Sequence, residues 1–303
     1  MIFIKNRVVF FCITGALVLA SLVSLFVFGL KLSTEFTGGT LVEVTYPDGR
    51  PASADLSTVL QEAGLHGFSL REAGESDFIL RAADMTPQER SALQEALSVG
   101  GENPATITQM TEVGPSVGTE LRRKAIIAIS LVLICILLFI AFAFRKVSQP
   151  VSSWVYGGMA IIALIHNIIV TTGFFALLGH FAGAEVDTLF VTAILTVLGF
   201  SVHDTIVVFD RTRENLAINK ERNRKEPFAE TAGRALGQTF VRSINTSLTV
   251  LITLLVLYFI GPQATKFFAL TLLVGIIAGT YSSIALATPL LVESERWLST
   301  KKK

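Results

Sequence analysis

The pattern of apolar and polar positions along the 303-residue chain shows six long apolar runs. A membrane-spanning helix needs about 20 apolar residues to cross a hydrocarbon core about 30 Å thick, and each run meets that length. The pattern therefore predicts six spans, at 8–30, 125–144, 151–178, 188–209, 239–260 and 267–291. The first run is too long for a cleaved signal peptide and is followed by no small-residue cleavage site, so we interpret it as a retained span.

The polar region 31–121 follows the first span, and its apolar positions switch between the strand period and the helix period. The predicted order is strand 41–46, helix 53–63, strands 67–72 and 77–82, helix 87–98 and strand 105–113. Thr86 is the expected N-cap of the second helix, with Pro87 at its first position. The order βαββαβ is typical of a ferredoxin-like α+β domain. The predicted fold class is thus a polytopic α-helical membrane protein with this domain between the first and second spans.

The distribution of lysine and arginine predicts the orientation of the spans. These residues gather at the N-terminus, around Arg145 and Lys146, in the loop 211–238 and in the tail 293–303. By the positive-inside rule both termini and this loop are cytoplasmic, and the domain is external. The predicted divisions are 1–30, the external domain 31–121, the five-helix region 122–292 and the basic tail 293–303. We interpret the basic loop as a solvated, topology-setting surface, and contact with anionic lipid or a cytoplasmic partner is the alternative.

Composition narrows the class of function. Hydrophobic residues make up 51% of the chain and charged residues 16%, and the mean hydropathy is +0.60, which is typical of a membrane protein. A net charge of +1 gives no reason to expect a nucleic-acid partner. Cys12 and Cys135 both lie in apolar runs, so they imply no disulfide framework. No Ser/His/Asp constellation, metal-ligand cluster or phosphate loop occurs in the sequence, which disfavours an enzyme and predicts no bound cofactor.

Charged residues inside two spans are the candidate functional residues. Asp204 lies beside His203 near the C-terminal end of the fourth span, and a carboxylate inside a membrane helix costs several kcal/mol on insertion scales. Arg242 lies inside the fifth span at a similar predicted depth. It shares one helical face with three polar residues, namely Asn245, Thr246 and Thr249. Such a face is expected to meet protein or a water path. The alternatives are an interfacial Asp204 and an Arg242 that extends to the cytoplasmic surface.

Other polar and small residues in the spans support this picture. His166 and Asn167 form a polar pair in the third span. Histidine side chains ordinarily titrate near neutral pH, so His166 and His203 each fit either a hydrogen-bonded structural role or a proton-handling role. Gly275 and Gly279 are spaced for close helix contact in the sixth span.

Three motifs give the chain a resemblance to a known family. They are Glu35-Phe-Thr-Gly-Gly-Thr40, the stretch from Gly199 to Asn215 around His203-Asp204, and Arg242-Ser-Ile-Asn-Thr-Ser247. With one span, a large external domain and five further spans, the chain resembles the SecF family. This family is the smaller half of the SecD/SecF complex of bacterial protein export, and it is related to the RND transporters. The family pattern usually has Asn in place of His203, and it often has His-Asp where this chain has His166-Asn167.

The resemblance implies a function, a location and partners. Such a protein uses the proton motive force to assist polypeptides that emerge on the outer side of the bacterial cytoplasmic membrane. It implies proton transport by Asp204 and Arg242, with protons as the only coupling species. The implied partners are SecD, the SecY-containing channel, the translocating preprotein and membrane lipids. A small-molecule or lipid efflux component of the RND kind and a non-conducting scaffold of the translocation channel are the alternatives. The single external domain disfavours the former, and dispensable membrane charges would favour the latter.

Overall fold

The computed structural model describes residues 2–65, 67–74, 76–82, 85–98, 104–145 and 150–301. It forms two compact units. The sheet unit comprises residues 31–127 and 185–188, and the helical unit comprises residues 1–30, 128–184 and 189–303. Lys146, Lys302 and Lys303, which contribute to the predicted orientation, lie outside the described residues.

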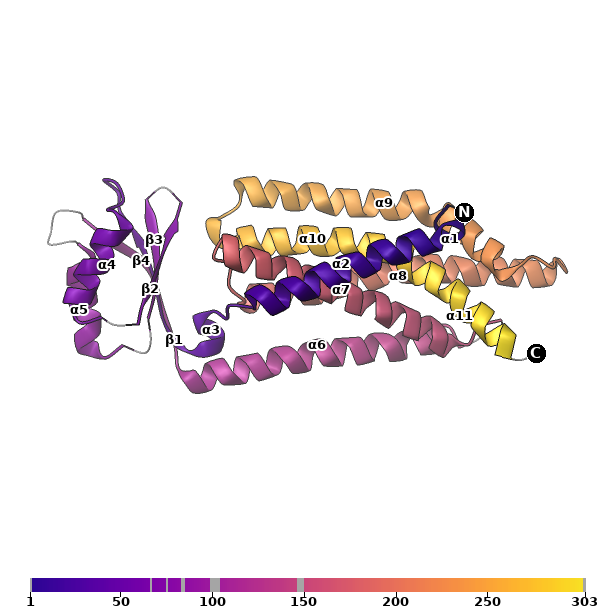
Figure 1. Ribbon diagram of the computed structural model, residues 1–303, viewed down its shortest axis with the longest axis horizontal. Helices are drawn as coiled ribbons and strands as arrows, with labels where there is room; N and C mark the ends of the chain where they lie inside the picture. Colours follow the sequence, from indigo (N-terminus) through magenta and orange to yellow (C-terminus); the bar gives the residue numbers. More distant parts are fainter. Residues whose placement is uncertain are drawn as a thin grey trace. The chain divides into compact units, whose positions relative to one another are not determined.

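The sheet unit contains an antiparallel sheet with two helices on one of its faces (Figure 1). Its elements are β1 (Gly39–Thr45), α4 (Ser53–Glu62), β2 (Ser69–Ala73), β3 (Asp77–Ala82), α5 (Pro87–Leu97) and β4 (Thr106–Val113), after the short helix α3 (Thr34–Thr37). The strands lie in the order β2-β3-β1-β4. Alternate strand residues such as Val42, Val44 and Phe78 point to one face and are fully buried against Leu56 and Leu60 of α4.

The start of α5 agrees with the sequence. The Thr86 side chain accepts a hydrogen bond from the Glu89 backbone N–H, and the Thr86 N–H donates to Glu89 Oε2 at 2.7 Å. This reciprocal capping box confirms Thr86 as the N-cap. The hydrogen bonds from Thr86 also hold the pKa of the Glu89 carboxyl below its usual value.

The helical unit is dominated by long helices. They are α2 (Arg7–Phe28), α6 (Pro115–Ala143), α7 (Ser153–Phe181), α8 (Thr188–Glu221), α9 (Phe228–Ile260), α10 (Lys266–Ser282) and α11 (Thr288–Lys301), with the short α1 (Ile2–Lys5) at the N-terminus. Among the described residues, six helices are long and apolar enough to cross a membrane. The last of these is formed by α10 and α11, joined by a π-helical turn over Ser283–Ala287. The six predicted spans are thereby confirmed.

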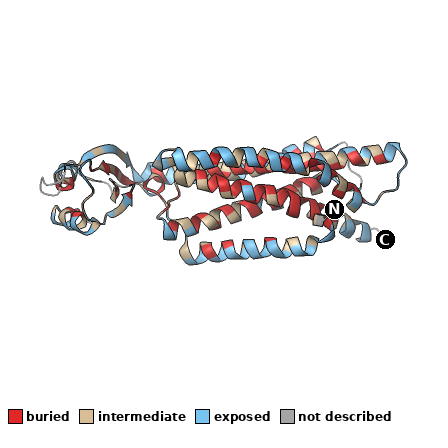
Figure 2. Ribbon diagram, turned by 90° about the horizontal axis from the view of Figure 1, so that it is seen from above, coloured by how far each residue is buried: buried red, intermediate tan, exposed pale blue. Residues whose placement is uncertain are grey.

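The burial pattern of the helices fits a membrane environment. Buried residues follow the faces that the helices turn toward one another, whereas the outer faces are exposed (Figure 2). Large apolar side chains occupy those outer faces, and Phe26 is 93% and Phe259 74% exposed. Lipid is the solvent in which such exposure carries no hydrophobic cost.

Helix ends are where the structure departs most from the sequence-based boundaries. The helix α6 begins at Pro115, ten residues before the predicted span, because proline is well suited to a first helical position. The predicted polar loop 211–238 consists mostly of helix, since α8 continues to Glu221 and α9 begins at Phe228. Hydrogen bonds from Arg211 and Asn215 to Gln238 join these two extensions.

The π-helical turn has a local cause. Pro289 has no N–H to donate to the carbonyl of Ala285, so the regular hydrogen-bond ladder cannot continue through this point. The turn before it widens, and the Thr288 hydroxyl donates to the Ser283 carbonyl at 3.0 Å. Turns of this kind are frequent at functional sites.

Candidate functional site

Asp204 lies in the interior of the helical unit. It sits on α8, is 3% exposed, and follows Ser201 by three residues on the same helical face. Within the described residues its Oδ2 atom has no hydrogen-bond partner. A buried polar atom without a partner is rare and marks a group available for chemistry or for an unseen partner.

Ser243 on α9 interacts with this carboxyl. Its side chain is 2% exposed and lies beside the Asp204 carboxyl group. The Ser243 Oγ atom also lacks a hydrogen-bond partner in the described part of the chain. One turn further along α9, the Ser247 and Thr280 hydroxyls are 2.6 Å apart and tie α9 to α10.

Arg242 and its polar stripe lie on another face of α9. Arg242, Asn245 and Thr249 are exposed, and Thr246 is half-buried. Among the described residues Arg242 has no ion pair, so the guanidinium does not contact Asp204 in this arrangement. The stripe instead faces away from this chain's bundle. His203 is likewise exposed, although it is adjacent to the buried Asp204 in sequence.

A hydrogen-bonded cluster joins α7 to α8 one turn from Asp204. The Asn167 amide Nδ2 donates to Ser201 Oγ at 2.6 Å, and Asn167 Oδ1 lies 3.0 Å from His166 Nδ1. Because the Asn167 oxygen can only accept, His166 Nδ1 carries the proton in this arrangement. His166 Nε2 then presents a lone pair that has no partner among the described residues. The ring of Tyr281 on α10 lies 6.2 Å from the His166 ring.

The predicted residues are therefore only partly assembled by this chain. Asp204, His166 and Asn167 share its interior, whereas Arg242 and His203 do not. Ser201 and Ser243 belong to the interior site but were not predicted. Ser201 lies three residues before Asp204, and this helical spacing could have identified it from the sequence as a residue on the same face.

The predicted helix contacts explain how α8 and α10 come close. A Cβ atom on Gly275 would overlap the Val197 side chain, and one on Gly279 would lie 3.0 Å from Ser201 Cβ. The absence of side chains at these two positions therefore allows α10 to pack on the face of α8 that carries Ser201.

The Glu35–Thr40 motif has a structural role in the sheet unit. The Glu35 carboxylate accepts hydrogen bonds from the Thr188 N–H, at 2.8 Å, and from the Thr188 hydroxyl. It thereby caps the first residue of α8, where a negative charge is favourable. Gly38 has a φ of +83°, and a Cβ there would lie 2.8 Å from Pro115 Cα, so a turn and a close approach both require glycine.

An ion pair next to this cap also belongs to the sheet unit. Arg81 on β3 pairs with Glu185, and both side chains are 17% exposed. Burial, with a further contribution from the nearby Arg71, lowers the pKa of Arg81 to about 10. The guanidinium stays charged at neutral pH, so the pair holds residues 185–188 against the sheet.

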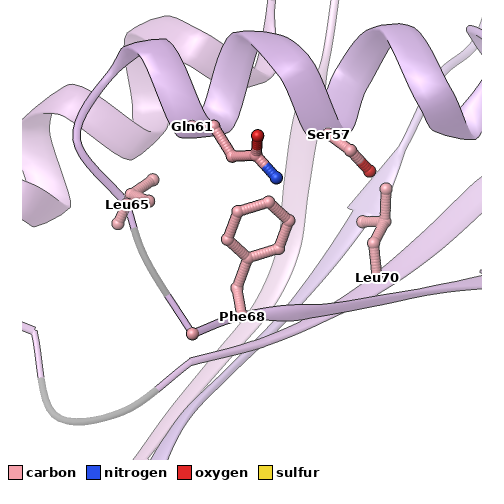
Figure 3. Close-up of a pocket in the computed structure, with 6 residues that line it drawn as sticks. Ser57, Gln61, Leu65, Phe68 and Leu70 are labelled. Atoms are coloured by element: carbon pink, nitrogen blue, oxygen red, sulfur yellow. The ribbon is translucent and has the colours of Figure 1, made fainter.

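The sheet unit also has a cavity of about 320 Å³ between α4 and β2 (Figure 3). Gln61 and Ser57 of α4 point toward Phe68 and Leu70 across it, and Leu65 closes one end. None of these side chains titrates, so the cavity offers shape and hydrogen bonds and no acid–base chemistry. In the described residues no three His, Cys, Asp or Glu side chains lie close enough to hold a metal ion.

Comparison with known proteins identifies the family. The family model "Protein export membrane protein SecD/SecF, C-terminal" matches residues 94–297, and the "SecD/SecF GG Motif" model matches residues 23–46. The chain belongs to the SecF family. A protein translocase subunit SecF from Thermobaculum terrenum is 41% identical, and the match covers 96% of this chain and 93% of the relative. SecF from Anaerolinea thermophila is 36% identical, with 98% and 96% covered.

A solved structure agrees with this assignment to the SecF family. The crystal structure of SecDF from Thermus thermophilus, described as a translocon-associated membrane protein, matches with a TM-score of 0.83 and 30% identity. The match covers all of this chain and 39% of the SecDF chain, so this chain spans about two fifths of that protein. The chain is thus a multi-pass membrane protein, and its SecF relatives are named as protein translocase subunits. The GG motif match contains Gly38 and Gly39, the turn at the Glu35 cap.

Proposed function

We propose that this chain acts with SecD and uses the proton motive force to assist Sec-dependent protein export across the cytoplasmic membrane. The observation that carries the proposal is Asp204, a carboxyl group buried inside a membrane bundle with one oxygen unpartnered in the described residues. A titratable acid in such a place is expected to serve an ion pathway. The role is one of transport, with protons as the coupling ion and no catalytic residue.

Arg242 is proposed to control the charge of Asp204 by moving toward it. A nearby guanidinium favours an ionised carboxyl, whereas desolvation favours a neutral one. Ser243 now lies beside Asp204, and Arg242 is the preceding residue on α9. Since an α-helix turns about 100° per residue, a rotation of that size would exchange the two side chains. The membrane potential contributes about 2.3 kcal/mol per charge for each 100 mV crossed, which is enough to bias such a cycle.

The exposed polar stripe of α9 supports a partner in the membrane. An arginine with Asn245 and Thr249 on a lipid-facing surface would be costly, so a protein or a water-filled path is expected to cover it. The SecDF relative contains a SecD part fused to a SecF part. SecD is therefore the proposed partner for this face, with an intramembrane acid of its own. The complex would associate with the SecY channel and the translocating preprotein.

The sheet unit is proposed to be an external ferredoxin-like domain that holds the emerging polypeptide. Its element order and its strand order β2-β3-β1-β4 support the fold, and the lysine and arginine distribution supports the external side. Helix motion would reach this domain through the first span and through the glycine connections at 38–39 and 114–118. Both termini would be cytoplasmic.

The test is proton flux through the reconstituted complex with SecD. Asp204→Asn retains the shape of the side chain and removes its titration, and Arg242→Met retains bulk and removes the charge. Both variants should assemble with SecD and lose proton flux together with proton-motive-force stimulation of translocation. The matched control is Asp210→Asn, since Asp210 lies on the same helix but is exposed. Flux is followed with a pH-sensitive dye inside proteoliposomes.

Two outcomes would support the other functions. If Asp204→Asn assembles normally and keeps full flux and export stimulation, the proton mechanism is wrong and a scaffold role remains. If the complex transports a small molecule or lipid in a proton-dependent way without affecting export, the efflux function is favoured.

A further inference from the structure

An apolar groove runs along the outer surface of the helical unit between α1, α9 and the α10 segment. Its volume is about 350 Å³. Phe3 and Phe240, whose ring centroids are 6.0 Å apart, lie at one end. Ile244 and Leu248 of α9 form one wall and Ile277 of α10 the other, and these three side chains are 38%, 52% and 55% exposed. The groove is therefore open toward the surroundings of the helices.

The polar atoms of the groove are already satisfied. The Ser247 and Thr280 hydroxyls pair with each other at 2.6 Å, and Thr280 also bonds to the Ile276 carbonyl. The Tyr281 hydroxyl donates to the Phe10 carbonyl at 3.1 Å and lies 3.1 Å from the Thr14 hydroxyl. A water molecule needs two to four polar partners, and the groove offers it none. The surface of the groove therefore matches apolar groups, either a hydrocarbon chain or apolar side chains.

The dimensions of the groove suit one hydrocarbon chain and not a helix. From Phe240 to Leu251 the α9 wall covers about 16 Å at 1.5 Å per residue. One leaflet of a hydrocarbon core is about 15 Å thick, so the groove extends over a single leaflet. A helix about 10 Å across occupies roughly 1,200 Å³ over that length, so only its side chains could enter the groove.

We propose that this groove is a binding site for one acyl chain of a phospholipid in the leaflet nearer to the α8–α9 loop. Charge supports the position of the headgroup. Lys5 is exposed on the same short helix as Phe3 and has no ion pair among the described residues, whereas the neighbouring Arg7 is engaged by Glu293. The Lys5 ammonium group is therefore the proposed contact for a lipid phosphate at this end of the helical unit.

The bound chain would stabilise the observed orientation of α9. The groove is closed at its base by Ser247, and Ser243 beside Asp204 is one turn before it on the same helix. A rotation of α9 would move Ile244 and Leu248 out of the groove. The proposal itself concerns lipid binding and stands whether or not Asp204 carries protons.

The experiment places the full chain in nanodiscs of phosphatidylethanolamine and phosphatidylglycerol with a trace of phosphatidylglycerol that carries a diazirine in its acyl chain. After irradiation, labelled residues are mapped by mass spectrometry. We expect labels to concentrate on Ile244, Leu248 and Ile277. Leu248→Trp, which fills the groove, should lower this labelling several-fold, and Ile277→Trp should do so from the other wall. Ile252→Trp is the matched control, because Ile252 is 54% exposed on α9 but lies outside the groove.

The headgroup contact has its own variant. Lys5→Gln should weaken labelling of the groove and leave the labelling around Ile252 unchanged. Equal labelling along all of the exposed surface of α9, unaffected by Leu248→Trp and Ile277→Trp, would show ordinary surrounding lipid and overturn the proposal. Groove labelling that disappears when SecD is added would assign the groove to a partner helix and overturn it as well.

Discussion

At the scale of single residues, hydrogen bonding separates structural polar groups from the proposed functional ones. Asn167 is 0% exposed, and both polar atoms of its side-chain amide form hydrogen bonds, Oδ1 with His166 and Nδ2 with Ser201. Asp204 Oδ2 and His166 Nε2 are buried without such partners among the described residues. Since unpartnered buried atoms are costly, those two groups are where a proton or a partner's side chain is expected to act.

Tyr46 is a structural polar residue, and its pKa predicts how the stability of the protein changes with pH. Burial raises its pKa to about 12, and its hydroxyl donates to the Leu97 carbonyl at 2.9 Å. Because folding raises the pKa of Tyr46, its burial contributes fully to stability at pH values below 10.0, the pKa in the unfolded chain. This contribution is lost as the pH rises toward about 12, the pKa in the folded chain. Tyr46→Phe should therefore be less stable than the native chain by about 1 kcal/mol at pH 7. The variant should also lack the fall in stability that deprotonation of Tyr46 causes in the native chain at high pH.

Two measurements check this prediction for Tyr46. Thermal unfolding followed by circular dichroism reports the stability of the full chain in detergent. Tyrosinate absorbance, compared between the native chain and Tyr46→Phe, should show the missing titration step near pH 12. Tyr258→Phe is the control, because Tyr258 is only half-buried on α9. A missing step near pH 10 would contradict the burial argument.

At the scale of elements, close helix contacts through glycine hold the helical unit together. A Cβ atom on Gly173 of α7 would lie 2.5 Å from the Cβ of Ser21 on α2, and the Ser24 hydroxyl donates to the Gly173 carbonyl at 2.8 Å. Without a hydrophobic driving force between helices in lipid, such close contacts and hydrogen bonds supply much of the association energy.

Replacement of Gly173 tests this contact. Gly173→Val should force α2 away from α7 and destabilise the unit by about 1–3 kcal/mol, the usual cost of overpacking. The matched control is Gly158→Val on the same helix, where an added Cβ meets nothing within 4 Å. The measurement is the midpoint of thermal unfolding in one detergent. Equal shifts in the two variants would mean that the loss does not come from the contact between Gly173 and Ser21.

At the scale of the whole molecule, the orientation in the membrane is the property to be tested. The native Cys12 and Cys135 are both free and exposed, so they are first replaced by serine. A single cysteine is then placed at Gln109 on β4 or at Arg222 in the turn between α8 and α9, both of which are exposed. Intact cells should be labelled at position 109 by a membrane-impermeant thiol reagent, and position 222 only after permeabilisation. The reverse pattern would invert the proposed topology.

Properties that depend on residues close together in the sequence could be predicted from the sequence. The six spans follow from runs of apolar residues, because a bilayer of fixed thickness requires a minimum length of apolar helix. The N-terminus of α5 follows from Thr86, Pro87 and Glu89, because a capping box is made within one turn. The polar residues that mark the interior, Asp204 and His166, stand out for the same local reason, since few polar groups are tolerated inside apolar runs.

The tertiary structure decided which faces meet. The helical period groups Arg242 with Asn245 and Ser243 with Ser247, but it does not determine which group turns toward Asp204, and the structure places Ser243 there. The contact between Glu35 and Thr188 joins residues 153 positions apart, and no local pattern contains it. Local periodicity therefore determined the helices, the strands and their polar stripes. Contacts between distant residues alone decided that this chain buries Asp204 and leaves Arg242 exposed, because each depends on how several helices pack at once.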